Sequence, residues 1–285
     1  MAKKRANAST PGDDGDGHQA SHFEAPTQQE HNESESLSNE KLLNELHAMY
    51  VDPKGGLLTA GRTLGLHLFA PRRKVNVLLI GNHSSGKSSF INWYVDAKVQ
   101  KTGVAIETQG FTVVTAGRRR ETLTGPATLR LFPYLKPLQS IPGVLQYLST
   151  ELVTPSAAHR STSSHLVTFV DTPGLADGEL HYPYDIERAI LWLGSYADLI
   201  LVFFDPIGQA LCKRTLTLVE HLTHQYSERM RFFLSKADQA GEESDRQKVM
   251  MQIVQELVRK EPPKTVCCSK TLNFFYFHPS ANARA

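Results

Sequence analysis

The sequence predicts an α/β protein with a mostly parallel sheet flanked by helices. Short apolar runs rich in branched residues alternate with longer stretches of helical periodicity. Strands that alternate with helices along a chain form parallel sheets covered on both faces. In addition, a glycine-rich stretch at residues 81–88 lies directly between the first apolar run and a helical stretch, which is where phosphate-binding loops occur.

Composition excludes several classes of protein. The 285 residues carry a formal net charge of +2 and are 40% hydrophobic, which suits a globular protein with a large core. This near-neutral charge argues against a nucleic-acid partner or a polybasic membrane tail. The three cysteines, two of them adjacent, cannot form a disulfide framework, so we expect a reducing, cytoplasmic compartment. Apolar runs stay below the roughly 18 residues of a membrane span, and we expect no secretory signal.

The N-terminal region divides into two parts. The first 40 residues hold eight acidic and three basic side chains, a net charge of −5, and few apolar ones. Such a segment buries too little surface to offset its ordering entropy, so residues 1–38 are predicted to be a disordered acidic tail. A helical element is predicted over residues 39–70, with one amphipathic helix at 39–50 and a weaker one at 57–69. It could pack on the rest of the chain or on a partner subunit.

Residues 71–268 are predicted to form the main α/β domain. Buried strands are expected at residues 75–80, 167–170, 199–204, 231–234 and 265–268. Helices are expected at residues 88–95, 183–195, 212–226 and 243–259. Two further strands, 111–116 and 121–123, are expected to be joined by an exposed turn whose arginines form a solvated tip. Residues 269–285 are predicted to be an irregular tail.

The strongest motif fits the pattern GxxxxGK[ST]. Its residues are Gly81, Asn82, His83, Ser84, Ser85, Gly86, Lys87 and Ser88, and Ser89 follows. Glycines at both ends let successive N–H groups point at phosphate oxygens, and the helix start adds its positive dipole end. Lys87 would supply a charge to the β- and γ-phosphates, and the Ser88 hydroxyl would complete a Mg²⁺ shell. The sequence therefore predicts a phosphate-loop nucleotide hydrolase.

A second motif, Asp171-Thr172-Pro173-Gly174, follows the predicted strand at 167–170. In phosphate-loop hydrolases an aspartate at this place holds Mg²⁺, usually through water, and the glycine offers its N–H to the γ-phosphate. Without the loop at 81–88, the same four residues would be read as a plain strand exit, because Pro-Gly breaks regular structure. Leu175 stands where Ras-like enzymes have a glutamine that orients the attacking water.

The third motif concerns the base of the nucleotide. Ser235-Lys236-Ala237-Asp238 matches [NTS]KxD after a strand. The Asp238 carboxylate can accept two hydrogen bonds from guanine, and the Lys236 stem would lie over the base plane.

In the loop at 98–110, Thr102 and Thr108 are candidates for a threonine that coordinates Mg²⁺ when the γ-phosphate is present. Thr108 is preferred because it lies just before a strand.

With these motifs in order, the sequence resembles the dynamin superfamily of large GTPases, and most of all the branch with the EH-domain-containing (EHD) ATPases and sarcalumenin. The segments that carry the resemblance are GNHSSGKSSFIN at 81–92, GVAIETQGFTVV at 103–114, FVDTPG at 169–174, ADLILVFFDP at 197–206 and LSKADQ at 234–239. The resemblance spans residues 40–266. His83 in place of Gln or Tyr, and Ser235 in place of Asn or Thr, depart from the family pattern.

The resemblance implies roles and partners. It aligns Thr108 with the switch threonine and Ser84 with a residue that helps to orient the attacking water, so Ser84, Lys87 and Thr108 are the expected catalytic residues. It also implies slow hydrolysis of GTP that is stimulated when two nucleotide domains pair, and association at the periphery of membranes, although the family's stalk helices are not visible here. ATP as the nucleotide, or a nucleotide-binding scaffold without useful catalysis, are the alternatives.

Overall fold

The computed structural model describes residues 28–66, 68–102, 109–154, 166–178, 181–207, 212–237, 239, 241–260 and 274–277. The chain separates into two compact units, Met1–Pro71 and Arg72–Ala285. Each unit is described by itself below. Among the helices of the described residues, none has the length and hydropathy needed to cross a lipid bilayer.

The first unit contains α1 (Gln28–Val51) and α2 (Leu57–Thr63). The helix predicted at 39–50 is present but starts eleven residues earlier, so residues 28–38 are helical and their assignment to a disordered tail is wrong. Residues 28–40 contain neither glycine nor proline, and a helix that has already formed extends at little cost through such a segment. The second helix ends at Thr63, earlier than predicted, and Gly65 follows with a φ of +70°, which ends regular helix.

The second unit is built on an eight-stranded sheet with the order β3-β4-β2-β5-β1-β6-β7-β8. The strands are β1 (Val75–Gly81), β2 (Phe111–Ala116), β3 (Glu121–Thr124), β4 (Leu148–Val153), β5 (Val167–Asp171), β6 (Leu199–Phe204), β7 (Met230–Ser235) and β8 (Phe274–Phe277). β1 pairs in parallel with β5 and β6, and β6 pairs in parallel with β7. The prediction of a mostly parallel sheet is therefore confirmed.

The edge near β3 differs from the prediction. β2 and β3 both form as predicted, but β4, a strand that was not predicted, lies between them in the sheet, parallel to β2 and antiparallel to β3. The turn arginines 118–120 are exposed as predicted. β2 is buried at four of its six positions and pairs with β4 over its whole length. The shorter, half-exposed β3 suits only the edge of the sheet.

The other edge also differs from the prediction. β8 runs parallel to β7 within the segment 269–285 that was expected to be irregular, and that expectation is wrong for residues 274–277. These residues are Phe-Phe-Tyr-Phe, and aromatic side chains favour strands. The strand predicted at 265–268, which contains Cys267 and Cys268, lies outside the described residues.

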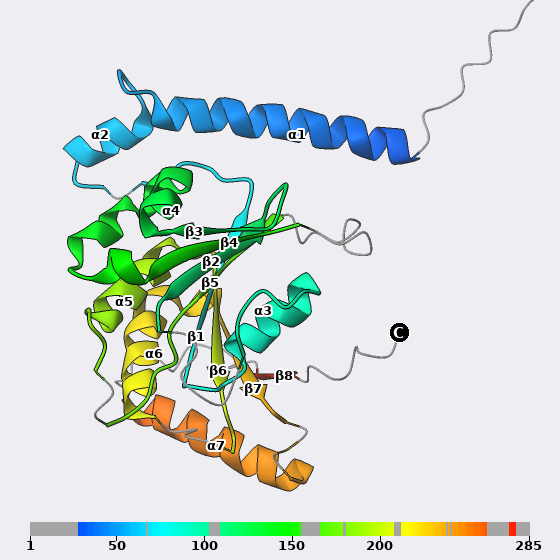
Figure 1. Cartoon of the computed structure of the whole chain (residues 1–285), viewed down its shortest axis with the longest axis vertical. Coiled ribbons are helices and arrows are strands. Elements are labelled where there is room, and N and C mark those ends of the chain that lie inside the picture. Colours follow the sequence, from blue (N-terminus) through cyan, green and yellow to red (C-terminus); the bar gives the residue numbers. More distant parts are fainter. Residues whose placement is uncertain are drawn as a thin grey trace, which may run out of the picture. The chain divides into compact units, whose positions relative to one another are not determined.

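Helices cover both faces of the sheet (Figure 1). In β1, Val77 and Leu79 face the side of α3 (Lys87–Val95), while Leu78 and Ile80 face the side of α5 (Ile186–Tyr196) and α6 (Lys213–Tyr226). α7 (Glu243–Lys260) buries Ile253 and Leu257 in the same core as α5 and α6. The remaining elements are short: α4 (Gly125–Leu131) and the 3-10 helices Pro133–Ser140, Val144–Tyr147 and Ser227–Arg229.

The topology decides where a ligand can bind. β1, β5, β6 and β7 are parallel neighbours, so their carboxyl ends lie at one edge of the sheet. Open α/β sheets bind ligands at that edge. The loop at 81–88 and the motifs that begin at Asp171 and Ser235 all lie at the carboxyl end of one of these strands.

Candidate nucleotide site

The loop between β1 and α3 has the backbone of a phosphate cradle. Gly86 adopts a φ of +83° immediately before α3, a conformation that favours glycine. A Cβ on Gly81 would lie 2.3 Å from the carbonyl oxygen of Phe203 on β6, so a larger residue does not fit there. Ser84, between the two glycines, also has a positive φ of 56°. Such strain in a non-glycine residue is found at ligand-binding turns.

The interior of this loop carries polar atoms without partners. Within the described part of the chain, the buried hydroxyl oxygens of Ser84 and Ser85 have no hydrogen-bond partner. Lys87 is buried, and its ammonium donates to the carbonyl oxygens of Gly81 at 3.2 Å and Asn82 at 2.9 Å. Burial lowers the pKa of Lys87 to about 8, although the nearby Asp171 charge opposes this effect. A bound phosphate would satisfy these groups.

Ser88 and Asp171 meet at the same place. The Ser88 hydroxyl donates to Asp171 Oδ2 at 2.7 Å, while the buried Oδ1 accepts no hydrogen bond from the described residues. Burial raises the pKa of Asp171, an effect that the Lys87 charge and the Ser88 hydroxyl partly offset. A hydroxyl and a carboxylate oxygen of this kind suit Mg²⁺, which takes one or two protein ligands and completes its shell with waters and phosphates.

The loop after β5 rests on the phosphate loop. Leu175 N donates to Gly81 O at 3.1 Å, and His83 N donates to Leu175 O at 2.8 Å. Gly174 approaches so closely that a Cβ on it would lie 2.5 Å from His83 Cα. Leu175 itself is fully buried. The loop at 81–88 and the segment 171–174, which were both predicted to bind phosphate, therefore lie together, with Gly174 against His83.

The Asn82 side chain connects the phosphate loop to α6. Its Oδ1 accepts a hydrogen bond of 2.5 Å from the Thr215 hydroxyl on α6, and both side chains are buried. The sequence held no signal for Thr215, because 133 positions separate the two residues.

The third motif lies next to the same loop. Ser235, at the end of β7, donates to Phe204 O at 3.1 Å, and its Cβ lies 3.4 Å from where a Cβ on Gly86 would be. Lys236 has a φ of 51°, and its ammonium forms an ion pair of 2.6 Å with Asp205 at the end of β6. This contact between Lys236 and Asp205 was not predicted from the sequence.

Several predicted residues remain without a structural test. Thr108 and Asp238 lie outside the described residues. Thr102 is described and exposed, and Ser89 lies half-buried in the first turn of α3. The described part of the site therefore consists of the cradle at 81–88, the segment Asp171–Leu175, and the pair Lys236 and Asp205.

A glycine-bounded loop with a buried lysine between a strand and a helix, next to an aspartate from the neighbouring strand, defines a phosphate-loop nucleotide-binding domain. The sequence profile of the Dynamin family matches residues 77–267. The chain belongs to this family, and the resemblance predicted from its sequence is confirmed.

The curated relatives that match are EH-domain-containing proteins. The chain is 28% identical over 174 residues to EH domain-containing protein 1 of Arabidopsis thaliana, covering 58% of this chain and 30% of that protein. It is 26% identical over 171 residues to EH domain-containing protein 3 of Homo sapiens, covering 58% and 31%. The chain thus spans about a third of the aligned relatives' length.

Solved structures that match this chain include a chain from an oligomerised bacterial dynamin pair, at 16% identity, covering 86% of this chain and 38% of that chain, with a TM-score of 0.45. They also include a single-residue variant of Era of Aquifex aeolicus bound to GDP.AlF4-, at 15% identity, covering 66% and 49%, with a TM-score of 0.38.

Proposed function

We propose that this domain binds GTP together with Mg²⁺ and hydrolyses it slowly, and that self-association speeds the hydrolysis. The observation that carries this proposal is the 2.7 Å contact between Ser88 and Asp171 beside the buried Lys87. A hydroxyl, a carboxylate and a buried ammonium then meet at the mouth of a backbone cradle. Phosphate-loop nucleoside triphosphatases use the same three groups for Mg²⁺ and for the β- and γ-phosphates.

Each residue then has a proposed role. Lys87 leaves the carbonyl oxygens of its own loop and binds the phosphates. Ser88 and Asp171 hold Mg²⁺, Asp171 through water, and Thr108 joins them when the γ-phosphate is present. When bound, Mg²⁺ neutralises charge that develops on the phosphates. Gly174 donates its N–H to the γ-phosphate, and Ser84 helps to orient the attacking water.

The nucleotide base is the point on which GTP and ATP differ. Asp238 would accept two hydrogen bonds from guanine, and Lys236 would cover the base from the position that Asp205 gives it. Adenine offers no such pair of donors on that edge. The resemblance to the EHD ATPases keeps ATP as the second candidate. Competition of the two nucleotides for one site separates them.

Slow hydrolysis follows from the residue after Gly174. Leu175 is fully buried and apolar, so it cannot orient a water molecule. A second copy of the domain paired across the nucleotide would exclude water and fix the catalytic segments. We therefore propose a cytoplasmic protein that acts as a pair and can work at the periphery of membranes. A specific hydrolysis rate that stays flat over a series of protein concentrations would contradict pairing.

A titration with fluorescent GTP and ATP analogues, with and without Mg²⁺, tests the proposal. We expect Mg²⁺-dependent binding with a preference for GTP. Lys87→Ala should abolish binding, whereas the matched control Lys248→Ala, on the exposed side of α7, should leave it unchanged. Binding without measurable hydrolysis at any protein concentration would favour the nucleotide-binding scaffold. Binding that survives Lys87→Ala would contradict the site itself.

A further inference from the structure

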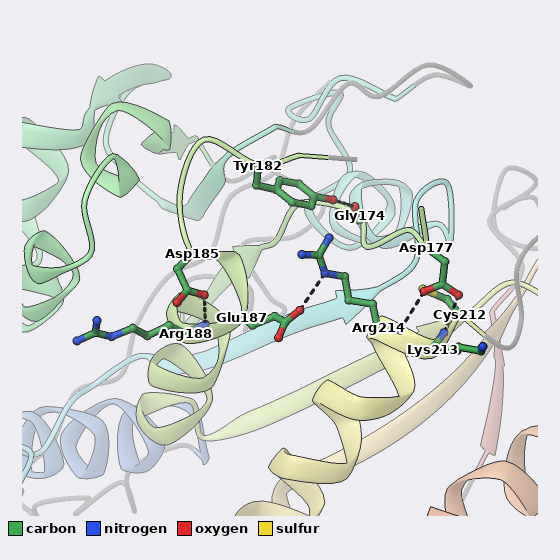
Figure 2. A network of polar contacts seen from close by, with 9 residues as sticks. All are labelled: Gly174, Asp177, Tyr182, Asp185, Glu187, Arg188, Cys212, Lys213 and Arg214. Atoms are coloured by element: carbon green, nitrogen blue, oxygen red, sulfur yellow. Dashed lines mark hydrogen bonds and ion pairs between the residues drawn. The ribbon is translucent and has the colours of Figure 1, made fainter. Parts of the chain in front are cut away.

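Tyr182 contacts the backbone of the segment that carries the second motif. Its phenolic hydroxyl donates a hydrogen bond to the carbonyl oxygen of Gly174, eight residues earlier in the chain. Tyr182 belongs to the loop that precedes α5, and Figure 2 shows its ring directed toward Gly174. The ring is half-buried against the core, with its centroid 6.4 Å from that of Tyr184.

A charged side chain from α6 covers this ring. Arg214 of α6 lies over it, with Cζ 5.5 Å from the ring centroid, and pairs at 2.9 Å with Glu187 of α5. Figure 2 shows Arg214 between Tyr182 and Glu187. Burial raises the pKa of Tyr182 against the opposing charge of Arg214, so the hydroxyl keeps its proton and remains a donor near neutral pH.

The same loop is also fixed three residues beyond Gly174. The Asp177 carboxylate accepts hydrogen bonds from Lys213 N at 2.8 Å, Arg214 N at 3.0 Å and Cys212 Sγ at 3.2 Å, all at the start of α6 (Figure 2). An acidic group at the amino end of a helix satisfies N–H groups that have no partner within the helix. The loop therefore cannot shift away from α6 without breaking these bonds.

These contacts hold one particular peptide plane at both ends. The carbonyl of Gly174 and the N–H of Leu175 belong to the same peptide group. Tyr182 binds its oxygen, and Gly81 O accepts from its N–H at 3.1 Å. Glycine has unusual freedom of both backbone dihedrals, and the preceding Pro173 has a fixed φ. With the following plane fixed, the Gly174 N–H has little freedom left.

We propose that Tyr182 is a positioning residue for Gly174, and that it directs the Gly174 N–H toward the terminal phosphate of a nucleoside triphosphate. This inference rests on the proposed function. A nucleoside diphosphate lacks the γ-phosphate toward which the Gly174 N–H is directed. Tyr182 therefore affects triphosphate binding and leaves diphosphate binding unchanged. Tyr182 thus contributes to the discrimination between GTP and GDP without touching either nucleotide.

The test compares Tyr182→Phe with the control Tyr226→Phe, which lies at the far end of α6. Both changes remove one hydroxyl and keep the ring. The affinity of each variant for GTPγS and for GDP is measured by calorimetry. We expect Tyr182→Phe to weaken GTPγS binding by about three- to tenfold relative to GDP, the value of one neutral hydrogen bond. The control should keep the wild-type ratio.

Hydrogen exchange of the nucleotide-free proteins provides a second measurement. The amides of Leu175 and His83 are protected by the bonds between the two loops, and they should exchange faster in Tyr182→Phe than in the wild type or the control. If the wild type binds no guanine nucleotide, the proposed function fails, and exchange alone decides whether Tyr182 holds Gly174. An unchanged exchange rate, equal losses for GDP and GTPγS, or a ratio shifted toward GTPγS would overturn the inference.

Discussion

Thr215 on α6 donates a hydrogen bond of 2.5 Å to Asn82 Oδ1 in the phosphate loop, and both side chains are buried. The second residue of the cradle is thereby attached to α6, the helix whose amino end also binds Asp177. The phosphate loop and the loop after β5 therefore share α6 as a common support. A substitution in α6 should therefore change nucleotide affinity even at a residue that does not contact the nucleotide.

Thr215→Val tests this support. The substitution keeps the shape of the side chain but leaves Asn82 Oδ1 buried without its donor, which costs about 1–3 kcal/mol of unfolding free energy. We expect chemical denaturation to register this loss and calorimetry to find weaker binding of GDP and GTP alike, because the cradle serves both. Thr217→Val, at an exposed position on the same helix, should change neither by more than about 0.5 kcal/mol.

The second prediction concerns the pH dependence of binding through Lys87. Burial lowers the pKa of this ammonium to about 8 in the free protein, and a bound triphosphate would favour its protonated form. Deprotonation above pH 8 therefore opposes binding. We expect the dissociation constant for GTP, measured at saturating Mg²⁺, to rise about tenfold between pH 7 and pH 9. An affinity that is constant over this range would contradict a phosphate contact by Lys87.

Stability should follow the opposite trend. A lysine whose folded pKa lies below its unfolded value of 10.5 destabilises the fold while both states are protonated. This penalty is relieved as pH rises above 8, because the folded state then releases its proton first. Urea unfolding should show the wild type gaining about 2 kcal/mol relative to Lys87→Met between pH 7.5 and pH 9.5. A parallel response of the two proteins would show that Lys87 is not buried.

The third prediction rests on the unequal burial of Lys236 and Asp205. The lysine side chain is 34% exposed and the aspartate side chain 4%. Lys236→Met leaves a buried carboxylate without its cation and should cost about 3 kcal/mol. Asp205→Asn leaves a lysine that water can reach, keeps an acceptor for Ile207 N, and should cost about 1 kcal/mol. Denaturation curves of both variants test this difference, and equal losses would contradict it.

Local sequence patterns predicted the parts of the fold that depend on neighbouring residues. The β1 strand, the cradle and α3 follow one another within about twenty positions. The apolar run predicts β1, and the glycines of the motif predict the cradle that precedes α3. β4 could not be predicted in this way. Its pattern Leu-Ser-Thr-Glu-Leu-Val alternates weakly, and its place between β2 and β3 is a pairing between distant segments that no local signal encodes.

The site shows the same limit. Lys87, Ser88, Asp171 and Gly174 belong to motifs whose spacing reveals their chemistry. No motif predicts the contacts of Thr215, Asp205 and Tyr182, since each acts through one contact that forms only after α6, β6 or the loop before α5 has been placed. Asp177 belongs to no predicted motif either. It is exposed, but its carboxylate caps a helix that begins 36 positions later.

The last prediction concerns this cap. The Asp177 carboxylate accepts from Lys213 N, Arg214 N and Cys212 Sγ. Partial desolvation raises the pKa of Asp177, but the hydrogen bonds from Arg214, Lys213 and Cys212 outweigh it, so the pKa is lowered overall.

A depressed folded pKa means that the carboxylate stabilises the protein above its unfolded pKa of about 4 and loses this effect as pH falls through the folded value. Because asparagine keeps an acceptor oxygen but loses the negative charge at the amino end of α6, Asp177→Asn should cost about 0.5–1 kcal/mol at pH 7, and the difference from the wild type should shrink below pH 4. Glu220→Gln, in the middle of α6 and away from its dipole ends, serves as the control and should cost little at either pH. A deficit of Asp177→Asn that is the same at pH 7 and pH 3.5 would mean that the charge of Asp177 does not stabilise α6.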